Sequence, residues 1–432
     1  MIKTEKKINI ITLGCSKNLV DSEQLAAKLE ENNYKISHNS EIFDFEIAIV
    51  NTCGFINDAK EESINTIIEL TNAKNNSKLE TIIVFGCLSE RYMNELKEEL
   101  PEVDVFFGNY NIDQILEYLN KTNNKQKYTR IFDSPGHYAY LKIAEGCNRN
   151  CSFCAIPLFK GKYISRNMED ILDEASYLAS IGVKELILIA QDLCYYGYDK
   201  NKTFELPELV ENLAKIDGIE WIRLHYLYPF LFPERLLDII AENPKVCKYI
   251  DIPLQHISDK VLKSMNRGGT KEQTIQLLNR IRKKIPEAVI RTTMLVGHPE
   301  ESKYEYDELL GFIKEQRFER LGVFTYSAEE GTRSFYNYKD EITEEVKNER
   351  AEKIMEIQQQ ISYELNSAKI GKIFKVLIDR IEGEFYIGRT EFDSVEVDND
   401  VIIKSENILN IGEFYNVKIT GFDDFELYGT VI

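Results

Sequence analysis

Three cysteines on one short stretch carry the strongest chemical signal in the sequence. Cys147, Cys151 and Cys154 occupy EGCNRNCSFC, directly after an apolar run at 138–144 that predicts a strand. Three thiolates on one loop can bind three irons of a cubane cluster, which leaves the fourth iron open to an exogenous ligand. An open iron indicates chemistry in addition to electron storage. A three-cysteine zinc site is the alternative, although structural zinc normally completes four ligands with paired spacings.

A second set of cysteines is dispersed along the N-terminal part of the chain. Cys15, Cys53 and Cys87 each follow an apolar run that predicts a strand, and each has a glycine beside it that would let the backbone approach a bulky ligand. The carboxyl ends of parallel strands line one edge of a sheet, so these thiols are expected to converge. The alternative is a small buried hydrophobe at each strand end. Cys194 and Cys247 have no partner at ligand spacing and are interpreted as packing residues.

The predicted strands fall into three groups. The first group, alternating with amphipathic stretches, favours a doubly wound α/β domain with a parallel sheet: 8–13, 47–51, 81–85 and 103–107. The polar segment 120–128 predicts a linker. The second group favours a partial (β/α)6 TIM-like barrel with its chemistry at the C-terminal strand ends: 138–144, 185–190, 221–226, 249–253, 289–296 and 321–326. A charged helix over 342–369 precedes a β-rich tail that predicts a small β-barrel. We therefore expect an α/β multidomain chain with domains at 6–122, 133–364 and 367–432.

Composition and charge narrow the function classes. The 432 residues exceed a single hydrophobic core, and no run approaches the ~18 apolar residues of a membrane span. The charged start of the chain lacks a secretory apolar region, so a cytoplasmic protein is expected, in which clustered cysteines are interpreted as metal ligands. The net charge of −19 argues against a broad basic surface for nucleic acid and suits a basic protein partner. Acidity that serves only solubility is the alternative.

Four motifs together resemble the methylthiotransferase family of the radical S-adenosylmethionine (SAM) superfamily, across nearly the whole chain: LGCSKNLVDSE, NTCGFINDAKEESI, GCLSERY and EGCNRNCSFCAIP. The resemblance implies an N-terminal methylthiotransferase domain, a radical SAM core and a terminal TRAM barrel. It also implies two [4Fe-4S] clusters and SAM as cofactors. Cys147, Cys151 and Cys154 would hold the cluster that generates a deoxyadenosyl radical, with an electron from an external reductant such as flavodoxin or ferredoxin. Cys15, Cys53 and Cys87 would hold the cluster that carries the sulfur.

The same resemblance implies SAM contacts outside the cysteines. Phe153 matches an aromatic position beside the adenine, with ordinary loop packing as the alternative. Gln191, after the second strand of the barrel, is the candidate contact for the amino group of SAM. Arg166 either orients the cofactor or pairs with a carboxylate. In LVGHPEES, His298 and Glu300 depart from the family's usual GFPGE, which puts the backbone approach to the cofactor in question.

Two substrates compete within the family, an aspartate β-carbon of the twelfth small-subunit ribosomal protein and an adenosine of transfer RNA. The stretches HYAYLKIAEGC, HYLYP and YIDIPLQH resemble the branch that modifies the ribosomal protein. The tail from 371 to 432 has thirteen Asp and Glu against six Lys and Arg, which also disfavours an RNA-gripping barrel. A two-cluster electron carrier, which normally has four cysteines per cluster, and a structural zinc and RNA-binding module remain as rivals from other classes.

Overall fold

The computed structural model describes residues 6–74, 76–109, 112–121, 129–133 and 135–432. It divides into two compact units, of which the first comprises Met1–Ser134, Glu145–Asn148 and Ala155–Tyr163 and the second comprises Pro135–Ala144, Arg149–Cys154 and Ile164–Ile432. Most of the predicted linker at 120–128 lies outside the described residues. The predicted domain limits at 6–122, 133–364 and 367–432 stay a prediction.

The first unit contains a parallel five-stranded sheet in the order β2-β1-β3-β4-β5. Its strands are β1 (Lys7–Thr12), β2 (Lys35–His38), β3 (Ile47–Thr52), β4 (Thr81–Gly86) and β5 (Val105–Phe106). Its helices are α1 (Ser16–Glu31), α2 (Asn57–Lys74), α3 (Cys87–Arg91), α4 (Met93–Glu99), α5 (Ile112–Tyr118) and α6 (Ile156–Lys160).

Both faces of this sheet are buried because alternate strand residues enter two separate cores. Val50 and Val84 pack with Ile67 and Leu70 of α2 on one face. The opposite face, which includes Ile49, packs against α1 and α5 through the following residues: Leu25, Ala26, Leu29, Ile115 and Leu116. A sheet covered on both faces explains why the strands are continuous apolar runs, and it confirms the predicted doubly wound arrangement.

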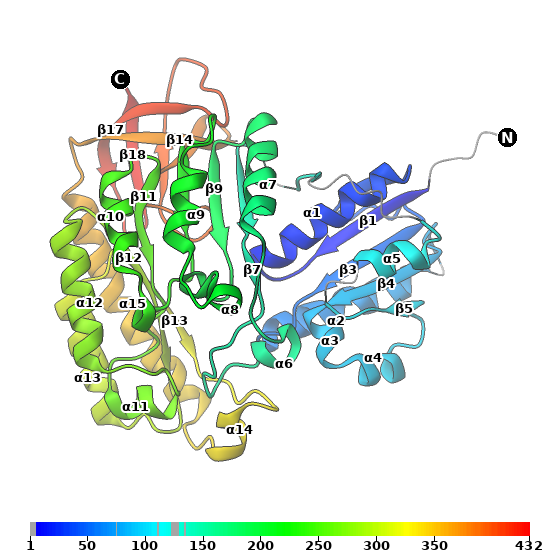
Figure 1. The fold of residues 1–432 in the computed structure, drawn as a ribbon, viewed down its shortest axis with the longest axis horizontal. Coiled ribbons are helices and arrows are strands. Elements are labelled where there is room, and N and C mark those ends of the chain that lie inside the picture. Colours follow the sequence, from blue (N-terminus) through cyan, green and yellow to red (C-terminus); the bar gives the residue numbers. More distant parts are fainter. Residues whose placement is uncertain (1–5, 75, 110–111, 122–128, 134) are drawn as a thin grey trace. The chain divides into compact units, whose positions relative to one another are not determined.

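The second unit is built on a parallel six-stranded sheet in the order β13-β12-β11-β10-β9-β6 (Figure 1). Its strands are β6 (Tyr138–Lys142), β9 (Glu185–Ile189), β10 (Trp221–Leu224), β11 (Val246–Asp251), β12 (Val289–Val296) and β13 (Arg320–Thr325). Two short strands, β7 (Ala144–Glu145) and β8 (Ile164–Ser165), form a separate pair.

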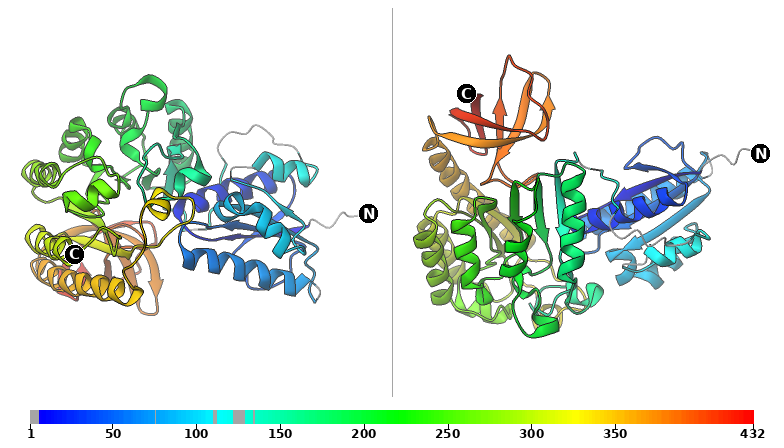
Figure 2. Two further views of the ribbon diagram at one scale, coloured as in Figure 1. Left: turned by 90° about the horizontal axis from the view of Figure 1, so that it is seen from below. Right: turned by 45° about the horizontal axis from the view of Figure 1, so that its top comes forward.

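Helices connect the six strands and lie along the outside of the sheet (Figures 1 and 2). They are α7 (Met168–Ser180), α8 (Tyr198–Asn201), α9 (Leu206–Leu213), α10 (Glu234–Glu242), α11 (Asp259–Ser264), α12 (Lys271–Lys284) and α13 (Lys303–Gln316), with 3-10 turns at η1 (Leu193–Tyr195) and η2 (Pro229–Leu231). A further short helix, α14 (Arg333–Asn337), follows the last strand, β13. Capping boxes at Thr270 with Gln273 and at Ser302 with Glu305 fix the starts of α12 and α13. The alternation of parallel strands and helices confirms the predicted barrel-type domain.

A long helix, α15 (Glu344–Ser367), leads to a closed five-stranded barrel in the order β14-β15-β16-β18-β17 (Figure 2). The barrel strands are β14 (Ile373–Glu382), β15 (Phe385–Thr390), β16 (Asp400–Ile403), β17 (Phe414–Phe422) and β18 (Glu426–Val431). Closure removes the exposed sheet edges that an open five-stranded sheet would leave. The small β-barrel predicted for the tail is therefore present.

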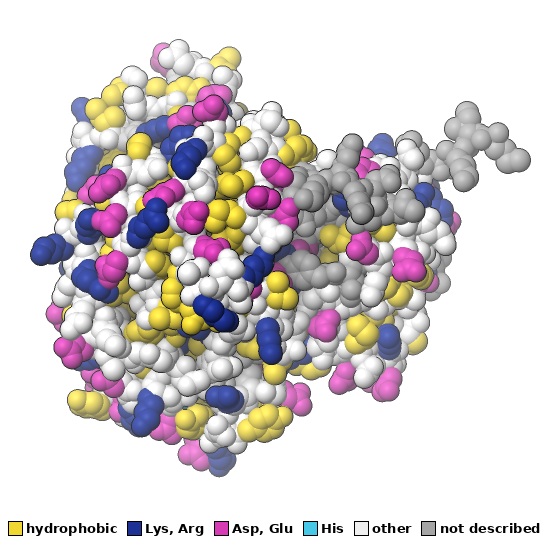
Figure 3. Space-filling model, in the orientation of Figure 1, with side chains coloured by type: hydrophobic (Ala, Val, Ile, Leu, Met, Phe, Trp, Pro, Cys, Tyr) yellow, Lys and Arg dark blue, Asp and Glu magenta, His cyan; other side chains and the backbone are white. Residues whose placement is uncertain are grey.

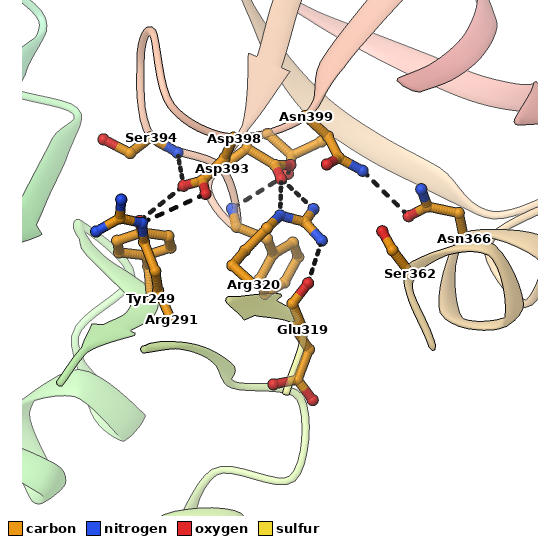
Figure 4. Close-up of polar contacts among 12 residues, drawn as sticks. Tyr249, Arg291, Glu319, Arg320, Ser362, Asn366, Asp393, Ser394, Asp398 and Asn399 are labelled. Carbon is orange, nitrogen blue, oxygen red and sulfur yellow. Dashed lines mark hydrogen bonds and ion pairs between the residues drawn. The ribbon is translucent and has the colours of Figure 1, made fainter. Parts of the chain in front are cut away.

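The loop between β15 and β16 attaches this barrel to β11, β12 and β13 of the six-stranded sheet, through Tyr249, Arg291 and Arg320 (Figure 4). Asp393 accepts from the guanidinium of Arg320, the first residue of β13, with an Nε–Oδ1 distance of 3.1 Å. Asp398 accepts from the hydroxyl of Tyr249 at 2.7 Å and lies 3.6 Å from Nε of Arg291. A second buried set joins the same two parts, and it consists of His137, Glu185, Arg223, Asp379 and Arg389.

The surface carries both signs of charge. On the face of the described residues drawn in Figure 3, Lys and Arg side chains are interspersed with Asp and Glu and do not gather into one basic surface. Within the part of the chain that is described, no helix is long and apolar enough to cross a membrane.

Candidate active site

The three N-terminal cysteines lie at the carboxyl ends of three adjacent strands. Cys15 precedes α1 shortly after β1, Cys53 follows β3, and Cys87 begins α3 directly after β4. Because β1, β3 and β4 are neighbours in a parallel sheet, the three residues share one edge, as the sequence predicts. Cys15 is exposed, whereas Cys53 and Cys87 are buried.

The glycines beside these cysteines are required by the closeness of neighbouring backbone segments. Gly14 has φ +91°, and a Cβ added there would lie 2.8 Å from Sγ of Cys53. A Cβ on Gly54 would lie 2.8 Å from the backbone of Leu88. The sequence suggests that these glycines let the backbone approach a bulky ligand. In the structure, they let the cysteine-bearing loops pack closely against one another.

Gly14→Ala is expected to destabilise the chain by about 1–3 kcal/mol, because the new methyl group would collide with Cys53 in a left-handed backbone conformation. Urea unfolding of the full chain measures the change. Gly311→Ala is the matched control, since Gly311 lies inside α13 with nothing within 4 Å of an added Cβ. That control should be neutral or stabilising by up to ~1 kcal/mol. Equal effects of the two substitutions would contradict the steric explanation.

At this edge the two buried thiols of Cys53 and Cys87 lie near the buried ammonium group of Lys160. Burial raises the pKa of Cys53 and raises that of Cys87 to about 12. Burial opposes the charge on Lys160, but Glu145, 3.3 Å away, and then Cys87 outweigh it and raise the pKa of the ammonium group. Iron binds thiolates, so cluster assembly at this edge must release protons.

The second cysteine set lies on the loop after β6. Cys147, Cys151 and Cys154 are all partly exposed, in contrast to the buried Cys53 and Cys87. The amide of Cys154 donates to the carbonyl of Cys151 at 3.2 Å, which makes the end of the loop a tight turn. The amide of Cys147 donates to the carbonyl of Gly161 at 3.1 Å.

Ser152, between the last two cysteines, is the best-anchored residue of this loop. Its amide donates to the carbonyl of Met265 at 2.8 Å, and its hydroxyl donates to the carbonyl of Ser264 at 2.7 Å. Ser334 returns two further bonds, from its amide to the carbonyl of Ser152 at 2.7 Å and between the two hydroxyls at 2.8 Å. The buried imidazole of His298 lies 3.4 Å from Oγ of Ser334, and burial lowers its pKa to about 4. Sequence patterns do not reveal this set, because its members are far apart in the chain.

The other predicted contacts have distinct environments. Phe153 packs against Val261, Met265, Leu295 and Tyr326, so hydrophobic loop packing is present at this position. The contact between Phe153 and the adenine stays a prediction.

The two polar candidates, Arg166 and Gln191, differ in whether their side chains already have hydrogen-bond partners. Arg166 donates to the carbonyl of Lys142 at 2.6 Å and forms an ion pair with Glu174 at 2.6 Å, which is the carboxylate pairing that the sequence left open. Gln191 directly precedes the carboxylate of Asp192, and its Oε1 is buried without a hydrogen-bond partner among the described residues. A buried acceptor without a donor is costly, so Gln191 is equipped to accept from a bound ligand.

The pair Arg149–Asp192 was not predicted. Nε of Arg149, within the cysteine loop, donates to Oδ2 of Asp192 at 2.7 Å. The Arg149 guanidinium carbon also lies 3.9 Å from the ring centroid of Tyr228, within cation–π range. Burial raises the pKa of Asp192, although Arg149 acts in the opposite direction. The position of Arg149 between two predicted iron ligands was the only sequence signal available.

In the part of the chain that is described, no three His, Cys, Asp or Glu side chains are placed to bind one metal ion. A [4Fe-4S] cluster makes a different demand, because each thiolate binds a different iron. Each cysteine set supplies three sulfur donors and no competing hard ligand of its own, and this donor set suits iron–sulfur chemistry.

Comparison with protein families defines the class. The model of the radical SAM superfamily matches residues 141–313, that of the uncharacterized protein family UPF0004 matches 7–108, and that of the TRAM domain matches 370–432. Among solved structures, the radical SAM methyltransferase TsrM from Kitasatospora setae aligns with a TM-score of 0.54 at 14% identity, covering 74% of this chain and 73% of that one. That likeness shows the fold alone. The chain is thus a radical SAM protein with UPF0004 and TRAM domains, and a [4Fe-4S] cluster and SAM follow from this class.

Full-length relatives identify the family within this class. The ribosomal protein uS12 methylthiotransferase RimO of Phocaeicola vulgatus is 53% identical over 427 residues, which cover 98% of this chain and 99% of the relative. The RimO protein of Bacteroides thetaiotaomicron is 53% identical over 99% of this chain and 98% of its own length. The chain belongs to the RimO family of ribosomal protein uS12 methylthiotransferases.

Proposed function

We propose that this chain adds a methylthio group to the β-carbon of an aspartate in ribosomal protein uS12. The observation that carries the proposal is the presence of two three-cysteine sets, each at the carboxyl end of strands in its own parallel sheet. An electron carrier normally binds each cluster through four cysteines and needs no iron that is open to a ligand. The full-length similarity to RimO proteins supports the enzyme over that carrier.

Cys147, Cys151 and Cys154 would hold the radical-generating cluster, and Cys15, Cys53 and Cys87 would hold a second [4Fe-4S] cluster. When bound, these groups and SAM supply the deoxyadenosyl radical and the methylthio group. The buried edge around Cys53 and Cys87 excludes water from two of the three sulfur donors. An external reductant such as flavodoxin or ferredoxin would deliver the electron.

The chain's own residues would bind and orient SAM beside the cysteine loop. Gln191 Oε1, which lacks a donor, would accept from the amino group of SAM. Phe153 would lie beside the adenine, held in place by its hydrophobic cluster. Arg166, already paired with Glu174, would act by fixing β6 through the Lys142 carbonyl and less by direct contact.

The TRAM barrel would hold the basic ribosomal protein by charge. Of the thirteen acidic and six basic residues between 371 and 432, Asp379, Asp393, Asp398 and Arg389 have side chains buried in the attachment to the sheet. Ten acidic and five basic residues remain outside that set, so the acidic excess persists. The barrel attaches at the amino-terminal strand ends, away from the cysteine loop, so it would steer and retain the substrate without touching the reacting carbon.

An anaerobic assay with mass spectrometry tests the substrate. The full chain, reconstituted with iron and sulfide and supplied with SAM and reductant, is offered a uS12 peptide containing the aspartate and, separately, transfer RNA. The expected product is a methylthio group on the peptide aspartate, with no change in the RNA. Modification of the nucleoside alone would overturn the substrate and keep the chemistry. Deoxyadenosine release without either product would overturn methylthio transfer.

A further inference from the structure

The segment after α11 lies against the loop that carries Cys151. Besides the two bonds from Ser152 to the carbonyls of Ser264 and Met265, Nδ2 of Asn266 donates to the carbonyl of Asn150 at 2.6 Å. Three consecutive residues, 264–266, therefore bind Asn150 and Ser152, the two neighbours of Cys151 in the loop. The contact is specific in register, and it brings the next residue, Arg267, to the sulfur of Cys151.

The backbone of this segment has an unusual conformation. Asn266 has φ +55° and Gly268 has φ +75°, both in the left-handed region. A Cβ on Gly269 would lie 2.0 Å from the ring of Phe230, so only glycine fits. The amide of Arg267 closes the turn on the carbonyl of Leu262 at 3.0 Å. Such conformations persist where the surrounding contacts determine them, and here they fix the position of Arg267.

Among the described residues, Arg267 is a buried cation with no carboxylate within ion-pair distance, although its charge acts on the nearby Asp192, against the burial that raises the pKa of that group. The residue is 7% exposed, and Nη1 donates to Sγ of Cys151 at 3.5 Å. Nη2 donates to the carbonyl of Pro253, and the guanidinium lies 4.8 Å from the ring centroid of Tyr228. Nε is buried and has no hydrogen-bond partner among the described residues, and within them Arg267 forms no ion pair. Arg149 provides the contrast, because Asp192 neutralises it at 2.7 Å.

Asp192 is already paired with Arg149, so Arg267 has no directly bonded anion of its own. A buried guanidinium without such a partner is costly, and an anion is therefore expected beside it. The chemical candidate is the sulfur of Cys151, which would carry negative charge once it binds iron. We propose that Arg267 is a positioning residue that raises the reduction potential of the radical-generating cluster through Cys151. This inference rests on the proposed assignment of Cys147, Cys151 and Cys154 to that cluster.

The physical basis is the charge that reduction adds. One electron passes from the external reductant to the oxidised cluster, and no bond or proton of Arg267 changes. A positive charge and an N–H donor at a ligand sulfur stabilise the reduced, more negative cluster more than the oxidised one. The alternative is that Arg267 only connects Pro253, Tyr228 and the cysteine loop mechanically, which would not alter the potential.

The test is a redox titration of the full chain, followed by electron paramagnetic resonance without SAM or substrate. Cys15, Cys53 and Cys87 are first replaced with alanine so that only the radical-generating cluster forms. In this parent, Arg267→Gln and Arg267→Met remove the charge, and Arg267→Lys keeps it. We expect the neutral variants to disfavour reduction about tenfold, which is about 59 mV toward negative potential for one electron. Arg267→Lys should retain more than half of the effect.

The matched control is Arg320→Gln. Arg320 is also a buried arginine, but it lies at the amino-terminal end of β13 and pairs with Asp393. This variant should be less stable and keep the parent's potential.

Unchanged potentials in the neutral variants at normal iron content would overturn the proposal and leave a mechanical role. Loss of iron from both neutral variants, with normal iron in Arg267→Lys, would also overturn it, because the charge would then be needed for binding. A parent that binds no cluster would refute the ligand assignment itself. Failure of the peptide assay alone would leave the potential measurement valid, so the two failures are distinguishable.

Discussion

Replacing Cys15, Cys53 and Cys87 with alanine is expected to abolish methylthio transfer and to leave SAM cleavage intact. The three residues lie on one sheet edge of the first unit, and in the proposal they hold only the second cluster. Iron should fall from about eight to about four atoms per chain. Replacing Cys147, Cys151 and Cys154 should remove the same amount of iron and abolish both reactions. Deoxyadenosine by chromatography, the peptide product by mass spectrometry and iron analysis check these results.

Cys247→Ala is the control for the loss of a thiol. Cys247 is 2% exposed and packs between Trp221, Tyr249 and Leu377, without a second cysteine near it in sequence. This change should reduce stability modestly and keep all the iron and both reactions. SAM cleavage that disappeared with the N-terminal triple substitution would show that the two cysteine sets do not act separately.

The sequence predicts most of the fold because the strands are buried on both faces. A strand such as β12 is a continuous apolar run, and its predicted limits of 289–296 match the observed Val289–Val296. The strand β2 escapes prediction because KISH is short and only partly buried, and its place is set by pairing with β1. Capping residues and turn glycines mark the helix limits, so α15 begins within two residues of its predicted start.

The cysteines of the candidate site could be found from the sequence, but the residues that fix them could not. Each cysteine follows a strand, and parallel topology then brings the N-terminal three to one edge. Arg267 binds Cys151 across 116 residues of chain, and no local pattern encodes that pairing. Ser334 binds Ser152 across 182 residues.

Charge alone misleads at the tail for a related reason. An acidic residue on a predicted barrel suggests a solvated surface, yet Asp393 is fully buried. It is buried there because Arg320, the first residue of β13 in the six-stranded sheet, supplies the compensating positive charge. Composition counts both residues and says nothing about their pairing.

Asp393→Ala is expected to weaken the attachment of the TRAM barrel by about 3–5 kcal/mol, because it removes the carboxylate that pairs with the buried Arg320 guanidinium (Figure 4). The chain contains one tryptophan, and Trp221 lies edge-to-face with Phe414 of β17 at a centroid distance of 4.8 Å. Its fluorescence therefore reports on this attachment directly. We expect the urea midpoint of the fluorescence transition to fall. Lys303→Ala, which breaks an exposed pair with Asp307, should change it by less than ~0.5 kcal/mol.

The same carboxylate makes the attachment sensitive to acid. Burial alone would raise the pKa of Asp393, but Arg320 and then Lys369 outweigh it and lower the pKa. A group with a depressed folded pKa contributes stability that is fully present above its unfolded value of about 3.9 and is lost as pH falls through the folded value. The parent midpoint should therefore fall below about pH 4, and Asp393→Asn should show a weaker dependence there.

Replacing both Arg320 and Asp393 distinguishes two contributions to stability. One is the attraction within the ion pair, and the other is the cost of leaving a single buried charge. The double variant Arg320→Met with Asp393→Leu should be more stable than Asp393→Ala, because the Arg320 charge is no longer left buried without its partner. A double variant as unstable as the single one would mean that the pair itself, and not the relief of a buried charge, holds the barrel. That result would assign the stability of the attachment to the hydrogen-bond network around Asp393, including its 2.7 Å bond from Thr390.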